Sequence, residues 1–285
     1  MPIGHSVRTS LRCVDHETRR LRGAAFDAVA DVYDRTRPTY PDRAVDWLLG
    51  SKPCTVLELG AGTGKLTGSL LANGHHVVAT DPSPVMLARL RGHYHNTGSV
   101  PARAEHLPFR SLSFDAVVVA QAFHWFDPAQ ALPEISRVLR PQGTFAMVWN
   151  SRDESVPWVR RLGTVIGGQD SLDEIDRHVT SVDSSGLFAP VERERFRFWQ
   201  QLDREGLRGL VESRSNVALL GSAERERVMA GVEALYAEYG RGHDGMRLPY
   251  ITQCFRTHRT SPAPPEPNPP QESPDSDGDL LFDFR

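Results

Sequence analysis

The sequence predicts an α/β protein whose core is a doubly wound sheet, and three observations lead to this fold class. Short apolar runs alternate with helical segments between residues 55 and 149, a rhythm typical of parallel strands joined by crossover helices. A glycine-rich turn follows the first of these runs, where such sheets bind ligands. Two more strand-like runs come later, at residues 192–199 and 248–255. Together these features predict a Rossmann-like, mostly parallel sheet of seven strands whose last strand is antiparallel, with helical cap insertions.

Apolar periodicity assigns the elements in chain order. Apolar residues at helical spacing between Phe26 and Tyr33 predict a helix ahead of the sheet. A second helix is expected to begin at Pro41, which suits a first helical position, and to stop at Gly50. A late helix is expected to end at Tyr239. In the alternating region the predicted strands are residues 55–59, 76–80, 99–103, 114–120 and 144–149, and the predicted helices are residues 65–72, 83–91 and 128–139.

Composition divides the chain into a folded region and two terminal segments. Residues 1–25 are Arg-rich with Ser and Thr, and we expect them to form a flexible arm. Residues 260–285 are rich in Pro and acidic residues, so they cannot bury enough apolar surface to order themselves. The domain between them, residues 26–259, carries insertions at about 151–189 and 203–245. We expect these insertions to form a cap over the strand ends and to build the substrate pocket there.

Charge and cysteine content disfavour several classes of protein. The net charge is −3 over 285 residues, so no basic field points to nucleic acid. The 3 cysteines have neither zinc-site nor disulfide-framework spacing, which predicts no metal site and a reducing, cytoplasmic compartment. The sequence contains no run of about 18 apolar residues that would predict a membrane span. Its N-terminus lacks an apolar secretory region.

The glycine-rich turn is the most informative local pattern, because its spacing disfavours two common ligand classes. An apolar strand ends near Glu58 and leads into three glycines within residues 60–64. A dinucleotide fold would need a third glycine where Lys65 stands, and a phosphate-binding loop would need Ser or Thr after that lysine instead of leucine. The next strand leads to Asp81, about 20 residues past the glycines, where nucleotide-binding folds place a carboxylate for ribose hydroxyls.

The remaining pattern, E-x-G-x-G-x-G at residues 58–64, resembles the first motif of class I S-adenosylmethionine-dependent methyltransferases. Further segments are similar to that family in order and spacing, namely residues 104–109, 114–119, 121–127 and 138–143. The N-terminal Tyr33-Asp34-x-x-Arg37-Pro38-x-Tyr40-Pro41 and the triplet His124-Trp125-Phe126 resemble the type 11 branch that contains trans-aconitate methyltransferase-like enzymes. The resemblance covers about residues 26–150 well and residues 190–256 in outline.

The resemblance implies S-adenosylmethionine as the cofactor and a role for each matched residue. At the methionine part of the cofactor, the expected contacts are the backbone of Gly60, Ala61, Gly62 and Gly64, with Glu58 near the ammonium. Its carboxylate would be covered by Tyr33, Arg37 and Tyr40, with Arg37 as the ionic partner. Asp81 would bind both ribose hydroxyls, Met86, Ala104 and Glu105 would surround the adenine, and Gln121 and Ala122 would lie beneath the sulfonium. Arg103 departs from the family, because many members carry an adenine-binding Asp there and arginine accepts no hydrogen bond.

Methyl transfer mainly requires alignment of the acceptor with an activated methyl group, and such positioning can lower a barrier by roughly 7–11 kcal/mol. His124 is the candidate base for a hydroxyl or amine acceptor. Trp125, together with Phe123, is the candidate aromatic neighbour of the sulfonium. A carboxylate acceptor needs no base, and His124 would then bind the acid. A third interpretation of His124 is a wall residue that packs and orients its neighbours.

Three functional hypotheses follow. The first is an enzyme that methylates a small-molecule acceptor, in which Arg152, Arg160 and Arg161 are candidates to hold an acid, although a solvated helix face explains them equally well. The second is a methyltransferase acting on tRNA or protein, and the near-neutral charge disfavours RNA. The third is a non-catalytic interaction protein acting through the acidic tail, which the intact cofactor residues disfavour. We expect no membrane partner, and a monomer or homodimer.

Overall fold

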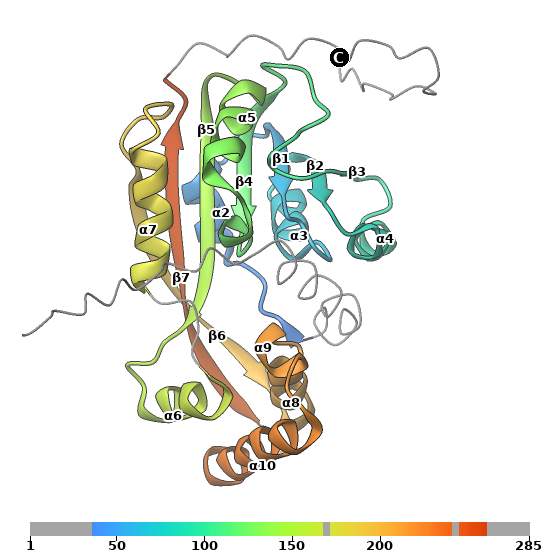
Figure 1. Cartoon of the computed structure of the whole chain (residues 1–285), viewed down its shortest axis with the longest axis vertical. Coiled ribbons are helices and arrows are strands. Elements are labelled where there is room, and N and C mark those ends of the chain that lie inside the picture. The colour runs from blue at the N-terminus through green and yellow to red at the C-terminus, as the bar shows by residue number, and fades with distance from the viewer. Residues whose placement is uncertain (1–35, 168–171, 241–244, 261–285) are drawn as a thin grey trace, which may run out of the picture.

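Seven strands form one sheet at the centre of the computed structural model, which describes residues 36–167, 172–240 and 245–260 (Figure 1). The strand order is β3-β2-β1-β4-β5-β7-β6. The strands are β1 (Thr55–Leu59), β2 (His76–Asp81), β3 (Gly98–Pro101), β4 (Phe114–Ala120), β5 (Leu139–Arg152), β6 (Glu192–Leu202) and β7 (Met246–His258). The pairs among β1 to β5 are parallel, whereas β7 runs antiparallel to both β5 and β6. The predicted fold class is therefore confirmed.

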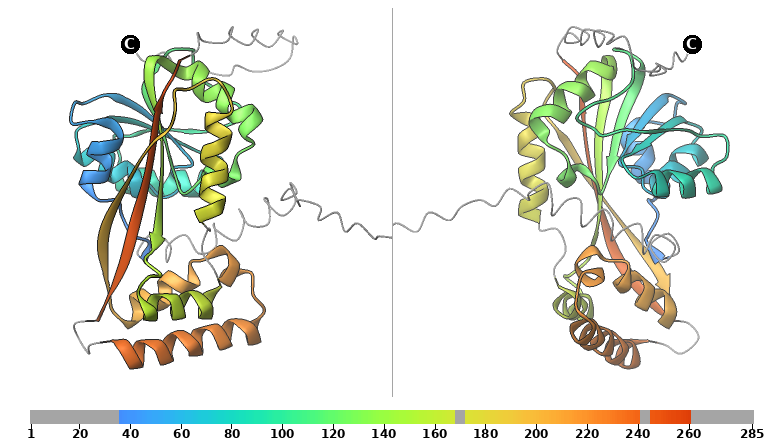
Figure 2. Two further views of the ribbon diagram at one scale, coloured as in Figure 1. Left: turned by 90° about the vertical axis from the view of Figure 1, so that its left-hand side faces the viewer. Right: turned by 45° about the vertical axis from the view of Figure 1, so that its right-hand side comes forward.

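Apolar side chains on both faces of the central strands hold the sheet between two layers of helices. Val117, Val118 and Val119 of β4 are fully buried, and burial of each such side chain contributes roughly 1.5–3 kcal/mol. Helices α2 (Asp42–Leu49), α3 (Lys65–Ala72) and α4 (Pro84–His93) cover one face, and α5 (Pro128–Val138) and α7 (Leu172–Asp183) cover the other (Figure 2).

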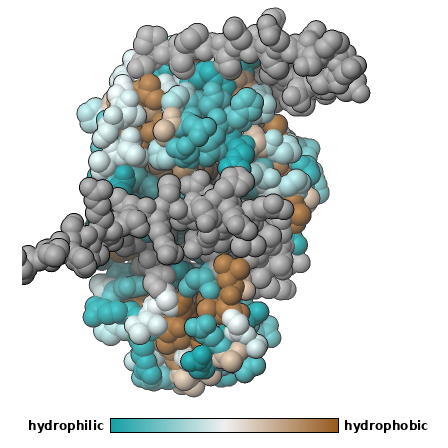
Figure 3. Space-filling model, in the orientation of Figure 1, coloured by the Kyte–Doolittle hydropathy of each residue, from teal (hydrophilic) through white to brown (hydrophobic). Residues whose placement is uncertain are grey.

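The remaining helices form a cap beyond the carboxyl end of β5. They are α6 (Pro157–Ile166), α8 (Arg204–Glu212), α9 (Ser215–Ala218) and α10 (Ser222–Tyr239). Their apolar sides share one buried cluster with the end of β6 and the start of β7, including Leu162, Leu210 and Leu235, and they lie below the sheet in both views of Figure 2. In the face shown in Figure 3, apolar surface gathers on the cap, and Leu219 between α9 and α10 is 52% exposed.

The two segments expected to form the cap behave differently. The described part of 203–245 and the first part of 151–189 lie in the cap, but α7 packs along the sheet beside α5. The reason is the spacing of Ile175, Val179 and Val182, which places three buried apolar side chains on one side of α7. That side joins the apolar cluster of the sheet and not the cluster of the cap.

The bounds of β5 and the start of α2 depart from the sequence expectation. Periodicity predicts a strand at residues 144–149, whereas β5 covers Leu139–Arg152. Pairing with β7 extends its carboxyl end, because its last residue still lies opposite Tyr250, and its first residue pairs with Phe114 of β4. Pro41 precedes α2 as its N-cap and does not occupy the first helical turn. The longer β5 carries the chain into the cap.

Several predictions fall on residues outside the described ranges. These are the helix before Tyr33, the arm of residues 1–25 and the tail from residue 261 onward. Within the described ranges, no helix is long and apolar enough to cross a membrane. The same residues contain no group of three or more His, Cys, Asp or Glu side chains placed to hold a metal ion.

Candidate active site

The turn between β1 and α3 has a backbone that favours glycine at three positions. Gly60, Gly62 and Gly64 have φ of 69°, 56° and 94°, a left-handed region that side chains disfavour. The Ala61 amide closes the turn by donating to a carbonyl of β2 at 2.9 Å. A Cβ at residue 60 would lie 2.5 Å from the Cβ of Ala122, whereas a Cβ at residue 62 would meet nothing within 4 Å. Gly62 therefore presents bare backbone to open space, as a ligand-binding turn requires.

Asp81, at the end of β2, ties this turn to the start of α4. Its Oδ2 accepts a hydrogen bond from the Gly62 amide at 2.9 Å, and its Oδ1 accepts one from the Ser83 amide at 2.8 Å. An ionised carboxylate has about four acceptor sites, so acceptor directions remain for hydroxyl groups of a ligand. The structure thus brings together the acid and the glycine turn that the sequence predicts for one site.

Glu58, next to the last residue of β1, is an acid enclosed by the fold. Glu58 is only 1% exposed. Its Oε2 accepts a hydrogen bond from the Thr67 hydroxyl of α3 at 2.5 Å. Burial raises the pKa of Glu58 to about 8, with a further rise from the charge of Asp81 and an opposing effect from the Thr67 hydrogen bond. The carboxyl group is therefore mostly protonated at neutral pH, and a cation placed beside it would favour the ionised form.

The carboxyl end of β4 leads into Gln121 and then the short 3₁₀ helix η1 (Phe123–Trp125). Gln121 has φ of 56°, a conformation that is uncommon for a residue with a side chain and that clusters at functional sites. Its Nε2 donates to the Asn150 carbonyl at 3.0 Å, which ties the end of β4 to the end of β5. The rings of His124 and Trp125 are partly buried, and their centroids lie 4.8 Å apart.

Phe123, the second aromatic candidate for the sulfonium, lies in the core with no exposed surface. It is fully buried, and its ring centroid lies 5.7 Å from that of Phe126 and 5.5 Å from that of His178. The turn after β4 directs this side chain toward α7 and the sheet, because an apolar ring gains most by complete burial. Trp125 remains as the aromatic candidate of the triplet.

Residues expected around the adenine lie at the other end of the site. Met86 of α4 and Ala104 are buried. The Glu105 carboxylate accepts a hydrogen bond from the Asp127 amide at 2.9 Å and lies 3.6 Å from Nε of Arg103. Glu105 thereby holds the start of α5, and a contact between Glu105 and a ligand stays a prediction.

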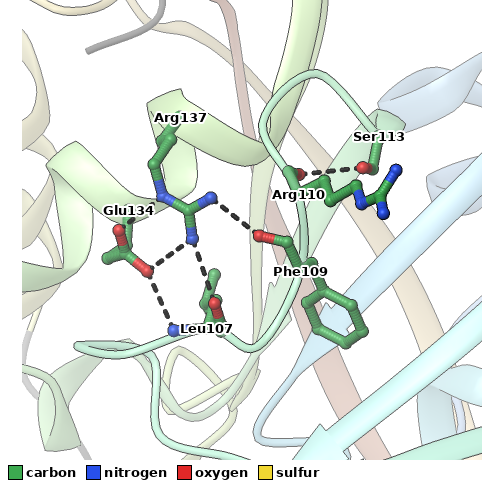
Figure 4. Close-up of polar contacts among 6 residues, drawn as sticks. All are labelled: Leu107, Phe109, Arg110, Ser113, Glu134 and Arg137. Atoms are coloured by element: carbon green, nitrogen blue, oxygen red, sulfur yellow. Dashed lines mark hydrogen bonds and ion pairs between the residues drawn. The ribbon is translucent and has the colours of Figure 1, made fainter. Parts of the chain in front are cut away.

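A buried ion pair holds the loop that follows Ala104, and sequence analysis did not find it (Figure 4). Arg137 of α5 is 4% exposed and donates to the carbonyls of Phe109 at 2.7 Å and Leu107 at 3.0 Å. Its Nε also donates to Glu134 at 2.7 Å, and Glu134 in turn accepts from the Leu107 amide at 2.9 Å. The only signal in the sequence is an acid three residues before an arginine, a spacing common on ordinary helix surfaces.

Segment 36–40 connects the sheet to the cap. Its backbone carbonyls accept hydrogen bonds from side chains of β5 and β6, and Nη2 of Arg37 donates to the Ser213 carbonyl at 3.4 Å. The Tyr40 side chain is buried with α2 and α3 in the core. Tyr33 lies outside the described residues. Contacts of these side chains with a cofactor stay a prediction.

The structure separates the three arginines predicted to hold an acidic substrate. Arg152 is buried at the end of β5. Arg160 and Arg161 lie on the exposed side of α6, where Arg161 pairs with Glu238 of α10 at 2.6 Å. Exposed pairs of this kind contribute little stability, about 0–1 kcal/mol. Arg152 is thus the member of the three that lies near the strand ends.

Comparison with known proteins identifies the family. The methyltransferase domain family matches residues 57–147. The chain is 42% identical over 241 residues to an uncharacterized methyltransferase of Mycobacterium tuberculosis (strain ATCC 25618 / H37Rv), covering 84% of this chain and 97% of that protein. The chain belongs to the class I S-adenosylmethionine-dependent methyltransferases.

Two further relatives show how far the likeness of this methyltransferase extends. The structure of a putative type II methyltransferase from Anaeromyxobacter dehalogenans shares the fold, with a TM-score of 0.58 at 22% identity, covering 78% of this chain and 97% of that one. Demethylmenaquinone methyltransferase of Clavibacter sepedonicus is 36% identical over 154 residues, which are 48% of this chain and 61% of that protein. These relatives do not single out the trans-aconitate branch, which stays a prediction.

Proposed function

We propose that this methyltransferase transfers the methyl group of S-adenosylmethionine to a small-molecule acceptor, and that the acceptor is a carboxylic acid. The observation that carries the proposal is the open backbone at Gly62, whose amide lies 2.9 Å from the Asp81 carboxylate. A nucleoside fits such a turn, because the backbone can approach it closely and the carboxylate has acceptor directions left. When bound, the cofactor supplies a methyl group on a positively charged sulfur, already activated for transfer.

The residues of the turn would hold the cofactor through charge and shape. Asp81 would accept hydrogen bonds from ribose hydroxyls, and Glu58 would lie near the ammonium group, whose charge favours the ionised carboxylate. The buried side chains of Met86 and Ala104 would shape the adenine end. Arg137 is a positioning residue, because it holds the loop after Ala104 and contacts no ligand in this proposal.

The cap favours a small acceptor. Helices α6, α8, α9 and α10 lie beyond the carboxyl end of β5, where parallel sheets of this type bind their ligands. A helical cap at this position encloses a compact substrate more readily than a polymer. The name of the Clavibacter sepedonicus relative, demethylmenaquinone methyltransferase, also describes action on a small molecule.

His124 and Trp125 would face the acceptor at the end of β4. For a carboxylic acid acceptor, the ionised oxygen is already a nucleophile, so no group need remove a proton. His124 would then donate a hydrogen bond that orients the acid. Trp125 would place its ring beside the positive charge on sulfur, an interaction of about 0.5–2 kcal/mol.

Methylation of a fractionated cell extract tests the proposed acceptor class. The protein and S-adenosylmethionine carrying a tritiated methyl group are added to extract that has been left untreated, digested with nuclease, or digested with protease and filtered. We expect label in low-mass compounds in all three samples. Label that disappears after nuclease or protease treatment would assign the enzyme to RNA or protein. Asp81→Ala should lose the activity, and Asp173→Ala, on the exposed first turn of α7, is the matched control.

A further inference from the structure

A cavity lies at the edge of the sheet, away from the glycine turn. It has a volume of about 260 Å³ and is bordered by the end of β6, the start of β7 and the start of α6 (Figure 1). Strand β6 is the third strand from β4 in the sheet order, and neighbouring strands lie about 4.8 Å apart, so β6 lies roughly 14 Å from the strand that leads to His124 and Trp125. The proposed methyl transfer therefore leaves this cavity without a role.

One wall of the cavity is built from the ladder between β6 and β7. Trp199 lies opposite Pro249, and Arg197 lies opposite Ile251. Alternate residues of a strand share a face, so Arg197, Trp199 and Arg247 project from the same face of the sheet. Trp199 is 57% exposed, and the guanidinium carbon of Arg247 lies 5.7 Å from the centroid of its ring. A cation–π contact thus holds a large exposed ring beside the cavity.

The other wall is the segment that leads into α6. The Asp153 amide donates to the Pro249 carbonyl at 2.9 Å, which fixes this segment against β7. Asp153 is 8% exposed, and its Oδ1 accepts hydrogen bonds from the amide and the hydroxyl of Ser155 at 3.2 and 2.5 Å. Trp158, the second residue of α6, stacks on Tyr239 of α10 with ring centroids 6.4 Å apart and an interplanar angle of 28°. Each wall therefore contributes one tryptophan to the lining.

Positive charge exceeds negative charge in the lining of the cavity. The lining contains two arginines, Arg197 and Arg247, and one carboxylate, that of Asp153. The carboxylate lies 3.9 Å from Nε of Arg197. Within the described ranges, Arg247 makes its ring contact with Trp199 and forms no ion pair. An anionic ligand would balance the remaining positive charge, whereas a cationic ligand would meet two guanidinium groups.

We propose that this cavity is a second ligand site, which binds a planar aromatic carboxylate. The ring of the ligand would stack on Trp199 or Trp158, because offset contacts between aromatic rings stabilise a complex beyond the area they bury. Its carboxylate would accept two parallel hydrogen bonds from the Arg247 guanidinium. Small-ligand pockets are commonly lined by aromatic side chains with a few polar groups that fix orientation. The volume of about 260 Å³ suits a compact molecule of one or two fused rings.

The charges along β6 disfavour a second copy of the chain as the occupant. Arg193 and Arg195 precede Arg197 on the same face of the strand, and Glu192 and Glu194 lie on the other face. If two copies joined edge to edge through β6, residues on the same face would lie opposite one another. Like charges would then meet on both faces of the joined sheet, which destabilises strand pairing.

Calorimetry on the full chain tests the site with benzoate, 2-naphthoate and indole-3-carboxylate as probes. Among the comparison ligands, 2-naphthamide lacks the charge, cyclohexanecarboxylate lacks the planar ring, and 2-naphthylmethylammonium reverses the charge. The variants are Arg247→Gln and Trp199→Leu. The matched control is Arg195→Gln, because Arg195 is an exposed arginine on the same face of β6 that does not line the cavity. All three replaced side chains are exposed, and thermal melting checks that each variant folds.

We expect 2-naphthoate to bind at least tenfold more tightly than each of the three comparison ligands. Arg247→Gln and Trp199→Leu should each weaken that binding at least tenfold, and Arg195→Gln should stay within twofold of wild type. Saturation with S-adenosylhomocysteine should change the affinity for 2-naphthoate by less than threefold, because the two sites are separate.

Four results would overturn the proposal. They are the absence of binding of all three aromatic carboxylates to folded wild-type protein, equally tight binding of 2-naphthamide, unchanged affinity in both variants, and displacement of 2-naphthoate by S-adenosylhomocysteine. A synthetic peptide with the sequence of residues 272–284 is titrated in parallel. If this peptide bound more tightly than the aromatic carboxylates and was weakened by Arg247→Gln, the cavity would be a docking site for the acidic tail, and the proposal would be wrong.

Discussion

Glu58 makes cofactor binding depend on pH in a way that can be worked out from its surroundings. Burial and the neighbouring charge of Asp81 raise its pKa to about 8 in the free protein. In the proposed complex the cofactor brings an ammonium group to this acid. A positive charge stabilises the ionised carboxylate, so binding is expected to expel the proton from Glu58. The substitution to test is therefore Glu58→Gln, which keeps the shape of the side chain and removes its titratable group.

The expected magnitude follows from the position of that pKa. With a pKa of about 8, roughly nine-tenths of Glu58 carries a proton at pH 7. Complete ionisation of Glu58 in the complex would thus release about 0.9 proton per cofactor bound at pH 7. The ligand's own amine, with a pKa near 7.7–8.0, takes up about 0.1–0.2 proton at the same pH because it binds as ammonium, so the net release is about 0.7–0.8 proton. The association constant should rise roughly eightfold between pH 6 and 7 and level off toward pH 8, where the amine loses its own proton.

Calorimetric titration with S-adenosylmethionine in buffers of different ionisation enthalpy measures this release directly. The slope of observed enthalpy against buffer enthalpy gives the number of protons. We expect a net release of about 0.7–0.8 proton at pH 7 for wild type, and for Glu58→Gln only the uptake of about 0.1–0.2 proton by the ligand amine. No proton release by the folded wild-type protein would refute the reasoning, as would the same release by wild type and variant.

Stability without cofactor should show the opposite dependence. The folded-state pKa of Glu58 is raised to about 8, so its contribution to stability is complete below the unfolded value of about 4.3 and is lost as the pH rises through about 8. Glu58→Gln should therefore become more stable relative to wild type as the pH increases from 5 to 9. Denaturant unfolding at several pH values checks this. A constant difference between the two proteins would contradict a protonated Glu58 in the free protein.

Other predictions concern the turn and the buried ion pair. Gly60→Ala should weaken cofactor binding and lower stability by about 1–3 kcal/mol, because its Cβ would lie 2.5 Å from that of Ala122. Gly62→Ala, which has a similar positive φ but nothing within 4 Å of its Cβ, should lower stability less, and equal melting temperatures would contradict this. Arg137→Met should lower the free energy of unfolding by roughly 3–5 kcal/mol, and a loss below 1 kcal/mol in urea would contradict its positioning role. Burial acts to raise the pKa of Glu134, but hydrogen bonds from Arg137 and the Leu107 amide and the Arg137 charge hold it below its ordinary value. Its stabilisation should therefore be present above about pH 4.3 and be lost as the pH falls through the folded value. Acid unfolding followed by circular dichroism should be shallower in Glu134→Gln than in wild type.

The elements that sequence periodicity located best are those whose signals are local. The first predicted strand, the helix after the glycine turn and the β-branched strand at residues 114–120 have the same bounds in the structure, as β1, α3 and β4. Glycines, a run of valines and a helix stop each act within a few residues of the boundary they set. The acid at Asp81 could be placed for the same reason, since strand β2 ends there.

Features that depend on contacts between residues far apart in the chain could not be predicted from the sequence. The carboxyl end of β5 is set by its pairing with β7, about 100 residues later in the chain. The position of α7 depends on which of two apolar clusters receives its buried side. Tyr250 carries no local pattern, and only the folded chain places it opposite Arg152. Phe123 was a candidate aromatic neighbour of the sulfonium, but its side chain is fully buried in the core.

Calorimetric titration with S-adenosylmethionine, and separately with NAD, tests the assignment of the glycine turn most directly. Wild-type protein should bind S-adenosylmethionine with micromolar affinity and should not bind NAD. Asp81→Ala should bind at least tenfold more weakly, because each hydrogen bond to an ionised group is worth roughly 1.5–3 kcal/mol, and Asp173→Ala should match wild type. Binding of NAD, or of neither ligand, by folded wild-type protein would contradict a cofactor site built on Gly62 and Asp81.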